Sequence, residues 1–505
     1  MHSSPSRAML SRPPDLIGPR RYRGRFAPYA LGTVLLGLAA VQLGFVAYAR
    51  VLHEPPGGFL ATALLALLAG YALRRLGSAR GEPSRREALL TVILTWLVVP
   101  AFGAVPLYVS GYFTPVNALF EAMSGFTTTG ATVLQDFATF PLSMFMWRAF
   151  MNWVGGIGII LVFIAVFPQL AIAGRQVFTA EAPGPTDERL TPRLRDTAMM
   201  LLGVYGGLTL ACVLAFRAAG MSLFDAVAHA FSTLAAGGFS TRALSFQAFE
   251  PEAVHWVAVV FMFLAGANFA LQYRLYVRRS GALLKDPEFR AYLLTVLAAS
   301  ACLVYLLRGQ YAFGDSVRHA LFQTVSIITT TGFASVDFAL WAAPAQVILI
   351  ALMFIGGSAG SASGGIKVVR WLIVLRQTGQ EVFRTLHPRA VLPVRLGRGI
   401  VPEEVVRSVA AFMTLYVLLF AVSTAALVLL GADYVTAFTA SIACIGNIGP
   451  GLEDVGPMLS FAELHPVARG LLTFDMYAGR LEVVTVFALF TRDWWRLPRR
   501  DAYRG

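Results

Sequence analysis

The sequence predicts an all-α polytopic membrane protein with ten transmembrane helices and four shorter helices that enter the membrane and return. The chain has 505 residues, of which 57% are hydrophobic and only 14% are charged, whereas a soluble protein carries roughly 25% charged residues. Apolar segments recur along most of the chain and reach the length of a membrane-spanning helix. They lack the alternating pattern of outer-membrane strands, so helices are predicted and a barrel is not.

The elements follow a repeated order after a first apolar pair at 27–49 and 57–73, which is expected to form a hairpin. Each later part contains a span, a half-span, a small-residue tip and a returning span. A helix needs about 20 residues to cross the hydrocarbon, so the shorter half-spans must turn back. The expected spans are 88–110, 143–168, 197–219, 253–276, 289–307, 342–375, 405–430 and 466–490, and the half-spans are 115–126, 223–234, 315–328 and 434–445.

This order divides the chain into an N-terminal arm with the extra hairpin and four repeats. The arm covers 1–82, and the repeats cover 83–188, 189–284, 285–398 and 399–505. Irregular backbone at membrane depth is tolerated only where it is buried in protein or lines a water-filled cavity. The four tips are therefore expected to line one common axis, which makes the half-spans re-entrant pore helices around a single pore.

The formal net charge of +13 is explained by topology and not by binding to nucleic acid. Arg residues cluster at 20–25, 74–86, 189–195, 274–279, 370–407 and 492–500, whereas the alternate loops contain Asp136, Glu250, Asp337 and Glu453 with few basic residues. Cytoplasmic loops of membrane proteins carry such an excess of Lys and Arg. We therefore expect both termini in the cytoplasm and half-spans that enter from the outer face.

The four small-residue tips, which directly follow the half-spans, predict a site for a dehydrated cation. Two of them read Thr-Thr-Thr-Gly, and the terminal glycines of the four stand 108, 94 and 117 positions apart (130 to 238, 238 to 332, 332 to 449). Glycine lets four chains approach closely, helix C-termini are partly negative, and backbone carbonyls can replace the hydration shell of a cation. The predicted filter residues are Thr127, Thr128, Thr129, Gly130, Ala235, Ala236, Gly237, Gly238, Thr329, Thr330, Thr331, Gly332, Gly446, Asn447, Ile448 and Gly449.

A run of Gly, Ala and Ser residues from 356 to 365 interrupts the returning span of the third repeat. Each Gly costs about 1 kcal/mol of helix stability relative to Ala. We predict an unwound loop that gates the path below the filter, and not a small-residue face for helix packing. The predicted gate residues are Gly356, Gly357, Ser358, Ala359, Gly360, Ser361, Gly364, Gly365, Lys367 and Arg480.

Charged and polar residues inside the spans leave alternatives open. Arg480 and Glu482 lie in the last span, where charge is expensive and marks either a pathway or an internal ion pair. Arg480 is thus expected to form an electrostatic barrier or a structural pair with a neighbouring helix. Lys367 is expected to line the pore or to extend towards the cytoplasmic face. Hydrogen bonds of a structural kind are expected for Asn152, Asn268 and His229.

Several motifs together resemble the Trk/Ktr/HKT superfamily of potassium-uptake proteins, and the Trk branch most closely. Each motif alone is weakly specific, whereas their order and spacing are highly specific. They are FEAMSGFTTTGAT from Phe120, WVGGIG from Trp153, HAFSTLAAGGFST from His229, the small-residue loop 356–367, HPRAV from His387, NIGPG from Asn447 and GRLE from Gly479.

The resemblance implies the fold described above and a homodimer with one pore per subunit. It also implies K+ as the bound and transported ion at the four tips, with no cofactor in the chain. It implies a gate at the loop 356–365 beside Arg480, and a separate cytosolic nucleotide-binding regulatory subunit. We expect a bacterial cytoplasmic (inner) membrane, with membrane lipid around the protein. Gly446 departs from the family, which often has a polar residue there.

Two classes of transport protein and one class of enzyme were weighed. A channel-like potassium-uptake protein is favoured by four in-register half-spans from one side of the membrane. The alternative is a secondary transporter of a small solute, which would use broken helices that meet at the midplane. A membrane enzyme would need an acid–base pair or a metal cluster at depth, and the sequence suggests none. Whether flux is passive or coupled to another ion stays open.

Overall fold

The computed structural model describes residues 26–78, 85–166, 190–277, 279, 281–390, 392–397 and 399–492. Within these ranges the protein is helical, apart from an antiparallel hairpin of β1 (Arg395–Leu396) and β2 (Gly399–Ile400). Six described helices are long and apolar enough to cross a membrane. They are α1 (Phe26–Val51), α2 (Gly57–Leu76), α3 (Arg85–Val109), α7 (Leu190–Ala218), α12 (Pro287–Leu306) and α16 (Glu403–Leu429). The Arg-rich segment predicted at 20–25 lies outside the described residues.

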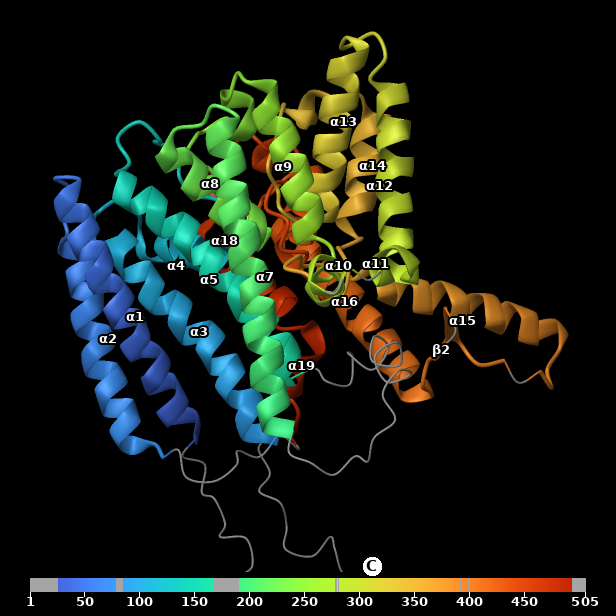
Figure 1. Cartoon of the computed structure of the whole chain (residues 1–505), viewed down its shortest axis with the longest axis horizontal. Helices are drawn as coiled ribbons and strands as arrows, with labels where there is room; N and C mark the ends of the chain where they lie inside the picture. The colour runs from blue at the N-terminus through green and yellow to red at the C-terminus, as the bar shows by residue number, and fades with distance from the viewer. Residues whose placement is uncertain are drawn as a thin grey trace, which may run out of the picture.

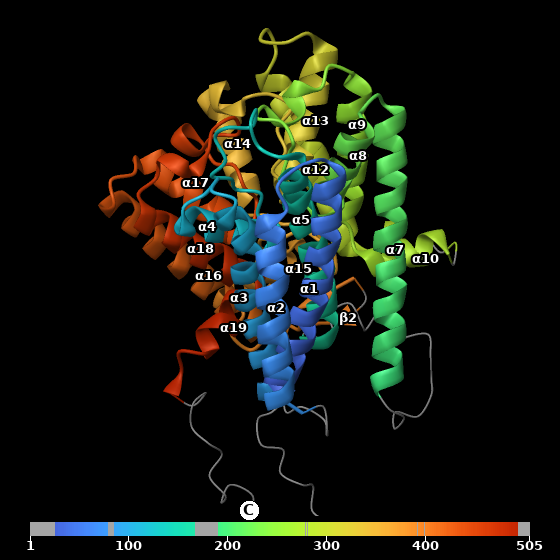
Figure 2. The ribbon, with the colours of Figure 1, turned by 90° about the vertical axis from the view of Figure 1, so that its left-hand side faces the viewer.

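The predicted N-terminal hairpin is confirmed, and it lies at one side of the bundle beside α3 (Figures 1 and 2). Its two helices approach each other closely at Gly32. A Cβ atom added there would lie only 2.6 Å from the carbonyl oxygen of Gly70. The turn of the hairpin also supports the next part of the chain. The Glu54 carboxylate accepts hydrogen bonds from the backbone N–H groups of Leu142 and Ser143, at the start of α5 (Leu142–Val166).

The four predicted half-spans are short helices, with bounds within two residues of those expected. They are α4 (Pro115–Phe126), α8 (Leu223–Ala235), α13 (Phe313–Ile328) and α17 (Tyr434–Ile445). Three begin at a residue whose side chain accepts a hydrogen bond from the first turn, as Thr114, Ser222 and Asp433 do, which is the usual device for fixing a helix start. Each helix ends directly at a predicted tip.

Two returning spans that were predicted as continuous helices are broken, and that part of the prediction is wrong. The span expected at 253–276 consists of α9 (Glu252–Ala265) and α10 (Phe269–Tyr276), bent by 106°. Asn268 causes the break, because its side chain accepts from the N–H groups of Ala270 and Leu271 and starts a new helix. The span expected at 466–490 is α18 (Pro466–Arg480) and α19 (Val483–Ala488), separated by Glu482 with a φ of +70°.

The third returning span is interrupted where an unwound loop was predicted. Helix α14 (Ala343–Met353) ends before the small-residue run, and α15 (Val368–Leu386) starts after it. Helix α15 extends sideways from the bundle (Figure 1) and contacts α12. The short helix α11 (Ala282–Lys285) lies between α10 and α12 in the chain. The segment 354–367 therefore lies between two helices and is not part of one.

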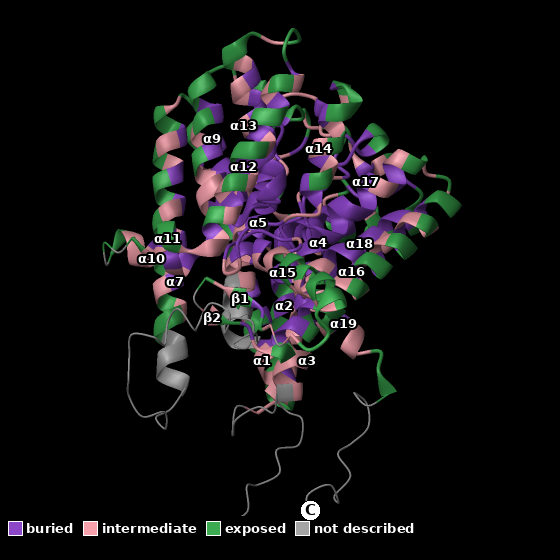
Figure 3. Cartoon of the chain, turned by 90° about the vertical axis from the view of Figure 1, so that its right-hand side faces the viewer, coloured by how far each residue is buried: buried purple, intermediate pink, exposed green. Residues whose placement is uncertain are grey.

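Buried residues gather in the middle of the bundle, around α4, α5 and α18 (Figure 3). The four short helices are buried far more completely than the long ones. Residues 118 and 120–126 of α4 are all buried, as are residues 436–437 and 439–445 of α17. The long helices instead expose many large apolar side chains, such as Leu68, Leu294 and Leu429, which is the pattern of helices that face lipid.

Candidate functional site

The four predicted tips share one backbone pattern, although their sequences differ. The second residue of each has a left-handed conformation: φ is +53° at Thr128, +54° at Ala236, +58° at Thr330 and +54° at Asn447. The fourth residue is a left-handed glycine in every case, at Gly130, Gly238, Gly332 and Gly449. Left-handed residues other than glycine are uncommon. The tips therefore adopt the same unusual backbone, whatever side chains they have.

The tips meet one another in a closed ring. At each fourth-position glycine, an added Cβ atom would collide with the carbonyl oxygen of the third residue of the next tip. The contacts are Gly130 with Gly237 at 2.4 Å, Gly238 with Thr331 at 2.1 Å, Gly332 with Ile448 at 2.0 Å, and Gly449 with Thr129 at 2.7 Å. The order runs from tip one to tip four and back to tip one. This close approach explains why glycine occupies all four positions.

In tips one and three, the hydroxyls of the first and third threonines form hydrogen bonds within the loop. Thr127 Oγ1 donates to the carbonyl oxygen of Met123 at 2.7 Å and bonds Thr129 Oγ1 at 2.8 Å. Thr329 makes the equivalent bonds to Val325 O and to Thr331 Oγ1. These bonds stiffen the loops. Of the remaining hydroxyls, Thr330 Oγ1 accepts from Gly364 N–H at 2.6 Å, and Thr128 Oγ1 has no hydrogen-bond partner among the described residues. Backbone carbonyls are the cation-binding groups that all four tips have in common.

Tip four reaches the same backbone by another route. A side chain at Gly446 would collide with Ile442 O at 2.8 Å and with the Ile448 side chain at 2.9 Å, so the glycine there has a packing reason. Tip four has no threonine hydroxyls, and the Asn447 side chain makes its hydrogen bonds instead. Its Nδ2 donates to Thr129 Oγ1 at 3.0 Å and to Met476 O at 2.9 Å, which links tip four to tip one and to α18.

Two cavities lie on either side of the ring. One is an open hollow of about 460 Å³ lined by all four glycines, together with Arg148, Asp454 and Glu463. The other is a cavity of about 70 Å³ lined by residues 359–361 and 363–365 and by Lys367, Gly479 and Arg480. The ring of tips therefore separates a wide hollow from a narrow one.

The predicted gate loop lies against tips three and four and is bonded on several sides. Gly364 N–H donates to Thr330 Oγ1 at 2.6 Å, and a Cβ atom at Gly364 would lie 2.5 Å from Gly446 O. Ala359 is held at both of its backbone groups, because its N–H donates to Glu288 Oε1 at 2.7 Å and its carbonyl accepts from Asn268 Nδ2 at 2.7 Å. Asn268, at the break between α9 and α10, therefore also anchors this loop.

Among the described residues, Arg480 forms no ion pair, and Glu482 pairs with a different arginine. Arg480 Nη1 donates to Ala362 O at 3.0 Å, while its Nε and Nη2 are buried with no hydrogen-bond partner in this part of the chain. Glu482 forms an ion pair with Arg370 of α15, whose guanidinium also lies 3.8 Å from the Phe412 ring centroid. Lys367 Nζ donates to the carbonyl of Ser363. Both Lys367 and Arg480 therefore line the narrow cavity, and the structural ion pair expected as an alternative for Arg480 is not formed.

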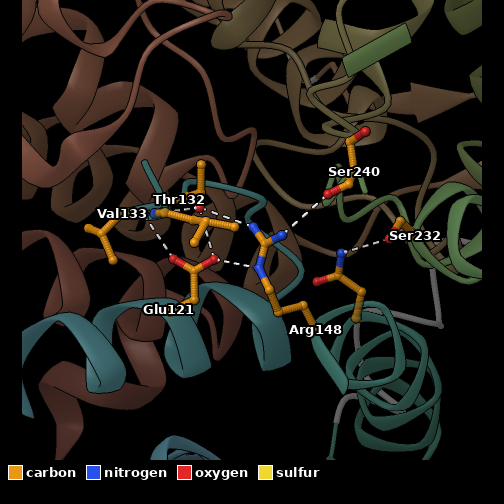
Figure 4. Close-up of polar contacts among 8 residues, drawn as sticks. Glu121, Thr132, Val133, Arg148, Ser232 and Ser240 are labelled. Atoms are coloured by element: carbon orange, nitrogen blue, oxygen red, sulfur yellow. Dashed lines mark hydrogen bonds and ion pairs between the residues drawn. The ribbon is translucent and has the colours of Figure 1, made fainter. Parts of the chain in front are cut away.

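An arginine that the sequence reasoning missed connects tips one and two (Figure 4). Arg148 of α5 is buried, and its Nε donates to Glu121 Oε1 at 2.7 Å. Its Nη2 donates to Thr132 Oγ1 at 3.0 Å and its Nη1 to Ser240 O at 3.2 Å. Glu121 also accepts from Val133 N–H at 2.8 Å. A charged residue within the span predicted at 143–168 was the signal for this cluster.

Three residues expected to be structural do make structural hydrogen bonds. Asn152 Nδ2 lies 3.3 Å from Ser232 Oγ of α8, and Asn268 holds the gate loop as described. The ring nitrogens of His229 form hydrogen bonds with Asp225 O at 2.8 Å and Ser240 Oγ at 3.0 Å, so both are used within α8 and the segment that follows tip two. Two further carboxylates, Glu288 and the buried Asp475, were also missed, although both lie at the edge of or within predicted spans.

A helical membrane protein with a closed ring of buried loops between two cavities belongs to the class of membrane transport proteins. The comparisons with known proteins agree with this class. The profile described as "TrkH: Cation transport protein" matches residues 59–494. The chain belongs to this TrkH family of cation transport proteins, and it is therefore a transport protein and not an enzyme.

Named relatives extend over most of the chain. The Trk system potassium uptake protein TrkH of Vibrio parahaemolyticus is 38% identical over 480 residues, which cover 92% of this chain and 98% of that protein. The TrkH of Escherichia coli K12 is 38% identical over 424 residues, covering 83% and 87%. The crystal structure of the potassium transporter TrkH from V. parahaemolyticus superposes with a TM-score of 0.84 at 35% identity, covering 93% of this chain and 99% of that one.

Proposed function

We propose that this protein takes up potassium ions across a bacterial cytoplasmic membrane through a channel-like pore. The observation that carries the proposal is the closed ring of four tips with matching left-handed residues. In this proposal the filter consists of backbone carbonyls at 127–130, 235–238, 329–332 and 446–449, which replace the water around a K+ ion. The relatives named as potassium uptake proteins support K+ as the ion. A secondary transporter of small solutes is not favoured by this family.

The gate in this proposal is the loop from Gly356 to Gly365, with Lys367 and Arg480 beside it. The loop contains two left-handed glycines, Gly360 and Gly365, and its hydrogen bonds to Glu288, Asn268 and Thr330 hold it below the ring. The buried guanidinium of Arg480 places positive charge at the narrow cavity, which repels a cation strongly where the dielectric constant is low. Opening requires the loop to move and this charge to be screened.

The proposed topology has ten transmembrane helices, four re-entrant pore helices and both termini in the cytoplasm. It assigns 1–82 to the N-terminal arm and hairpin, and 83–188, 189–284, 285–398 and 399–505 to four pore repeats. We further propose a homodimer whose opening is controlled by a cytosolic nucleotide-binding subunit. The printed name "Trk system" of the relatives supports an assembly of several components.

The test is cation uptake by the purified protein in proteoliposomes, with Gly332→Ser as the filter variant. Gly332 has a φ of +79°, and its Cβ atom would lie 2.0 Å from Ile448 O, so a side chain must distort the ring. Gly314→Ser is the matched control, since Gly314 starts α13 and nothing lies within 4 Å of its Cβ position. The wild type and Gly314→Ser are expected to take up K+ and Rb+ in preference to Na+, and Gly332→Ser is expected to lose that preference.

Two outcomes would contradict the proposal. The first is an absence of cation flux in the wild-type protein. The second is a preference for K+ that Gly332→Ser leaves unchanged. Either result would favour the alternative of a secondary transporter for a small solute.

A further inference from the structure

A buried carboxyl group in α18 has no role in the filter or the gate. Asp475 is 0% exposed, and its Oδ1 accepts a hydrogen bond from Ser423 Oγ of α16 at 2.8 Å. Its Oδ2 is buried and has no hydrogen-bond partner among the residues that the structure describes. Burying an ionised carboxylate without a compensating charge is very unfavourable. The group therefore needs a cation, a proton or a partner that the hydrogen bond to Ser423 does not supply.

Within the described residues, the helices packed against α18 bring no free cation to Asp475. These helices are α4, α16, α17 and α19, and α3 is joined to α18 by a hydrogen bond from Tyr477 Oη to Ile93 O at 3.2 Å. The titratable and charged groups of the first four helices are Glu121, which pairs with Arg148; Glu403, Glu404, Arg407 and Tyr416 of α16; Tyr434 and Cys444 of α17; and Glu482 just before α19, which pairs with Arg370. Glu403, Glu404 and Arg407 lie in the first turns of α16, and Glu403 pairs with Arg407.

The arginines of α18 itself point elsewhere. Arg469 donates to Asn117 Oδ1 of α4, and Arg480 donates to Ala362 O in the gate loop. Arg480 follows Asp475 by five residues, which places the two side chains about 140° apart around the helix axis and about 7.5 Å apart along it. The buried carboxyl group and the buried guanidinium therefore do not neutralise each other, although they share a helix.

We propose that Asp475 is a proton-binding site, whose carboxyl group carries a proton on Oδ2 at neutral pH. The neutral acid removes the unpaired charge and keeps the hydrogen bond from Ser423 at Oδ1. On α16, Tyr416 Oη is also buried without a hydrogen-bond partner among the described residues. A metal ion fits less well, since no group of three His, Cys, Asp or Glu ligands occurs among the described residues.

The proton site lies behind the fourth tip. The residue after Asp475, Met476, accepts through its carbonyl from Asn447 Nδ2 of that tip at 2.9 Å. One turn further, a Cβ atom at Gly479 would lie 1.9 Å from Ile445 O of α17. Loss of the proton would place an uncompensated charge in this tightly packed contact between α17 and α18. The contact is therefore expected to loosen at alkaline pH, together with the position of Asn447. This proton binding goes beyond the proposed potassium uptake and does not depend on it.

The direct test is infrared spectroscopy of the full-length protein in lipid nanodiscs at neutral pH. The wild type is expected to have a carbonyl-stretch band of a protonated carboxylic acid that is lost in Asp475→Asn. Ser423→Ala removes the hydrogen bond to Oδ1 and is expected to shift this band. Asp136→Asn, at an exposed loop residue, is the matched control and is expected to leave it unchanged. An Asp475→Asn spectrum that keeps this band would overturn the proposal. If Asp475→Asn does not fold, a band that is unchanged in Ser423→Ala would overturn it instead.

A second readout uses the pH dependence of stability and needs no ion flux. The folded state keeps the Asp475 proton at a pH where the unfolded chain has lost it, so stability falls as the pH rises. The wild-type unfolding equilibrium constant is expected to rise by up to about tenfold per pH unit from this group alone, between the ordinary Asp pKa of about 3.9 and the pH at which the folded protein itself loses the proton. Asp475→Asn is expected to lack this component. Equal pH dependence of the two proteins would contradict proton binding at Asp475, whatever the transport assay gives.

Discussion

Arg148 and Arg480 are both buried arginines beside the ring of tips, yet their hydrogen bonding is opposite. Arg148 uses all three of its side-chain nitrogens, on Glu121, Thr132 and Ser240. Arg480 uses one nitrogen, on Ala362 O, and leaves two without a partner. The first lines the wide hollow and the second the narrow cavity.

The difference indicates that Arg148 stabilises the fold and that Arg480 acts on the conducted ion. Removing one member of a buried, hydrogen-bonded ion pair leaves the other charge buried and uncompensated, which destabilises the fold. A buried charge with unused donors stores an unfavourable interaction, which a structure retains only where that charge has a function. We therefore expect Arg148 to matter for stability and Arg480 to matter for conduction.

The largest expected effect is that of Arg148→Met. The substitution leaves the Glu121 carboxylate buried without its partner and should reduce the free energy of unfolding by about 3–5 kcal/mol. Thermal unfolding of the purified protein in detergent would measure the loss. Combining it with Glu121→Gln should restore part of the stability, because the orphaned charge is then removed. An Arg148→Met variant with wild-type stability would contradict the assignment of this arginine to the fold.

A smaller effect on stability, but a clear effect on flux, is expected for Arg480→Gln. The Gln amide can still donate to Ala362 O, and no carboxylate is left unpaired, so the unfolding temperature should change little. Removing the positive charge should raise Rb+ uptake roughly tenfold, a change of about 1.4 kcal/mol in the barrier. Uptake into proteoliposomes would measure it. If Arg480→Gln instead unfolds as readily as Arg148→Met, the contrast between the two arginines fails.

Local sequence patterns predicted the parts of the site that depend on the backbone. The short helices before each tip, the small-residue run at 356–365 and the tips themselves follow from segment length, capping residues and glycine positions. At tip four only Gly449 matches the other tips by residue type, yet Asn447 and Gly449 have the same left-handed backbone as their counterparts. The backbone pattern is common to all four because each terminal glycine meets a carbonyl of the next tip.

Contacts between distant segments could not be predicted in the same way. The break after α9 depends on Asn268 bonding both its own helix and Ala359, which lies 91 positions away. The end of α18 depends on Glu482 pairing with Arg370 across 112 positions. Apolar periodicity treats both stretches as continuous spans, since a single polar residue barely alters it. Arg148 was missed for a related reason, because its partner Glu121 lies on another helix.

The central claim is that the four tips form one cation site, and a crystal structure with Rb+ tests it most directly. We expect anomalous density for Rb+ on the axis of the ring, with the carbonyl oxygens of Thr129, Gly237, Thr331 and Ile448 around it. Replacing Rb+ by Na+ should remove this density. Density absent from the ring, or bound to a side chain at only one tip, would contradict a filter built from the backbone of four loops.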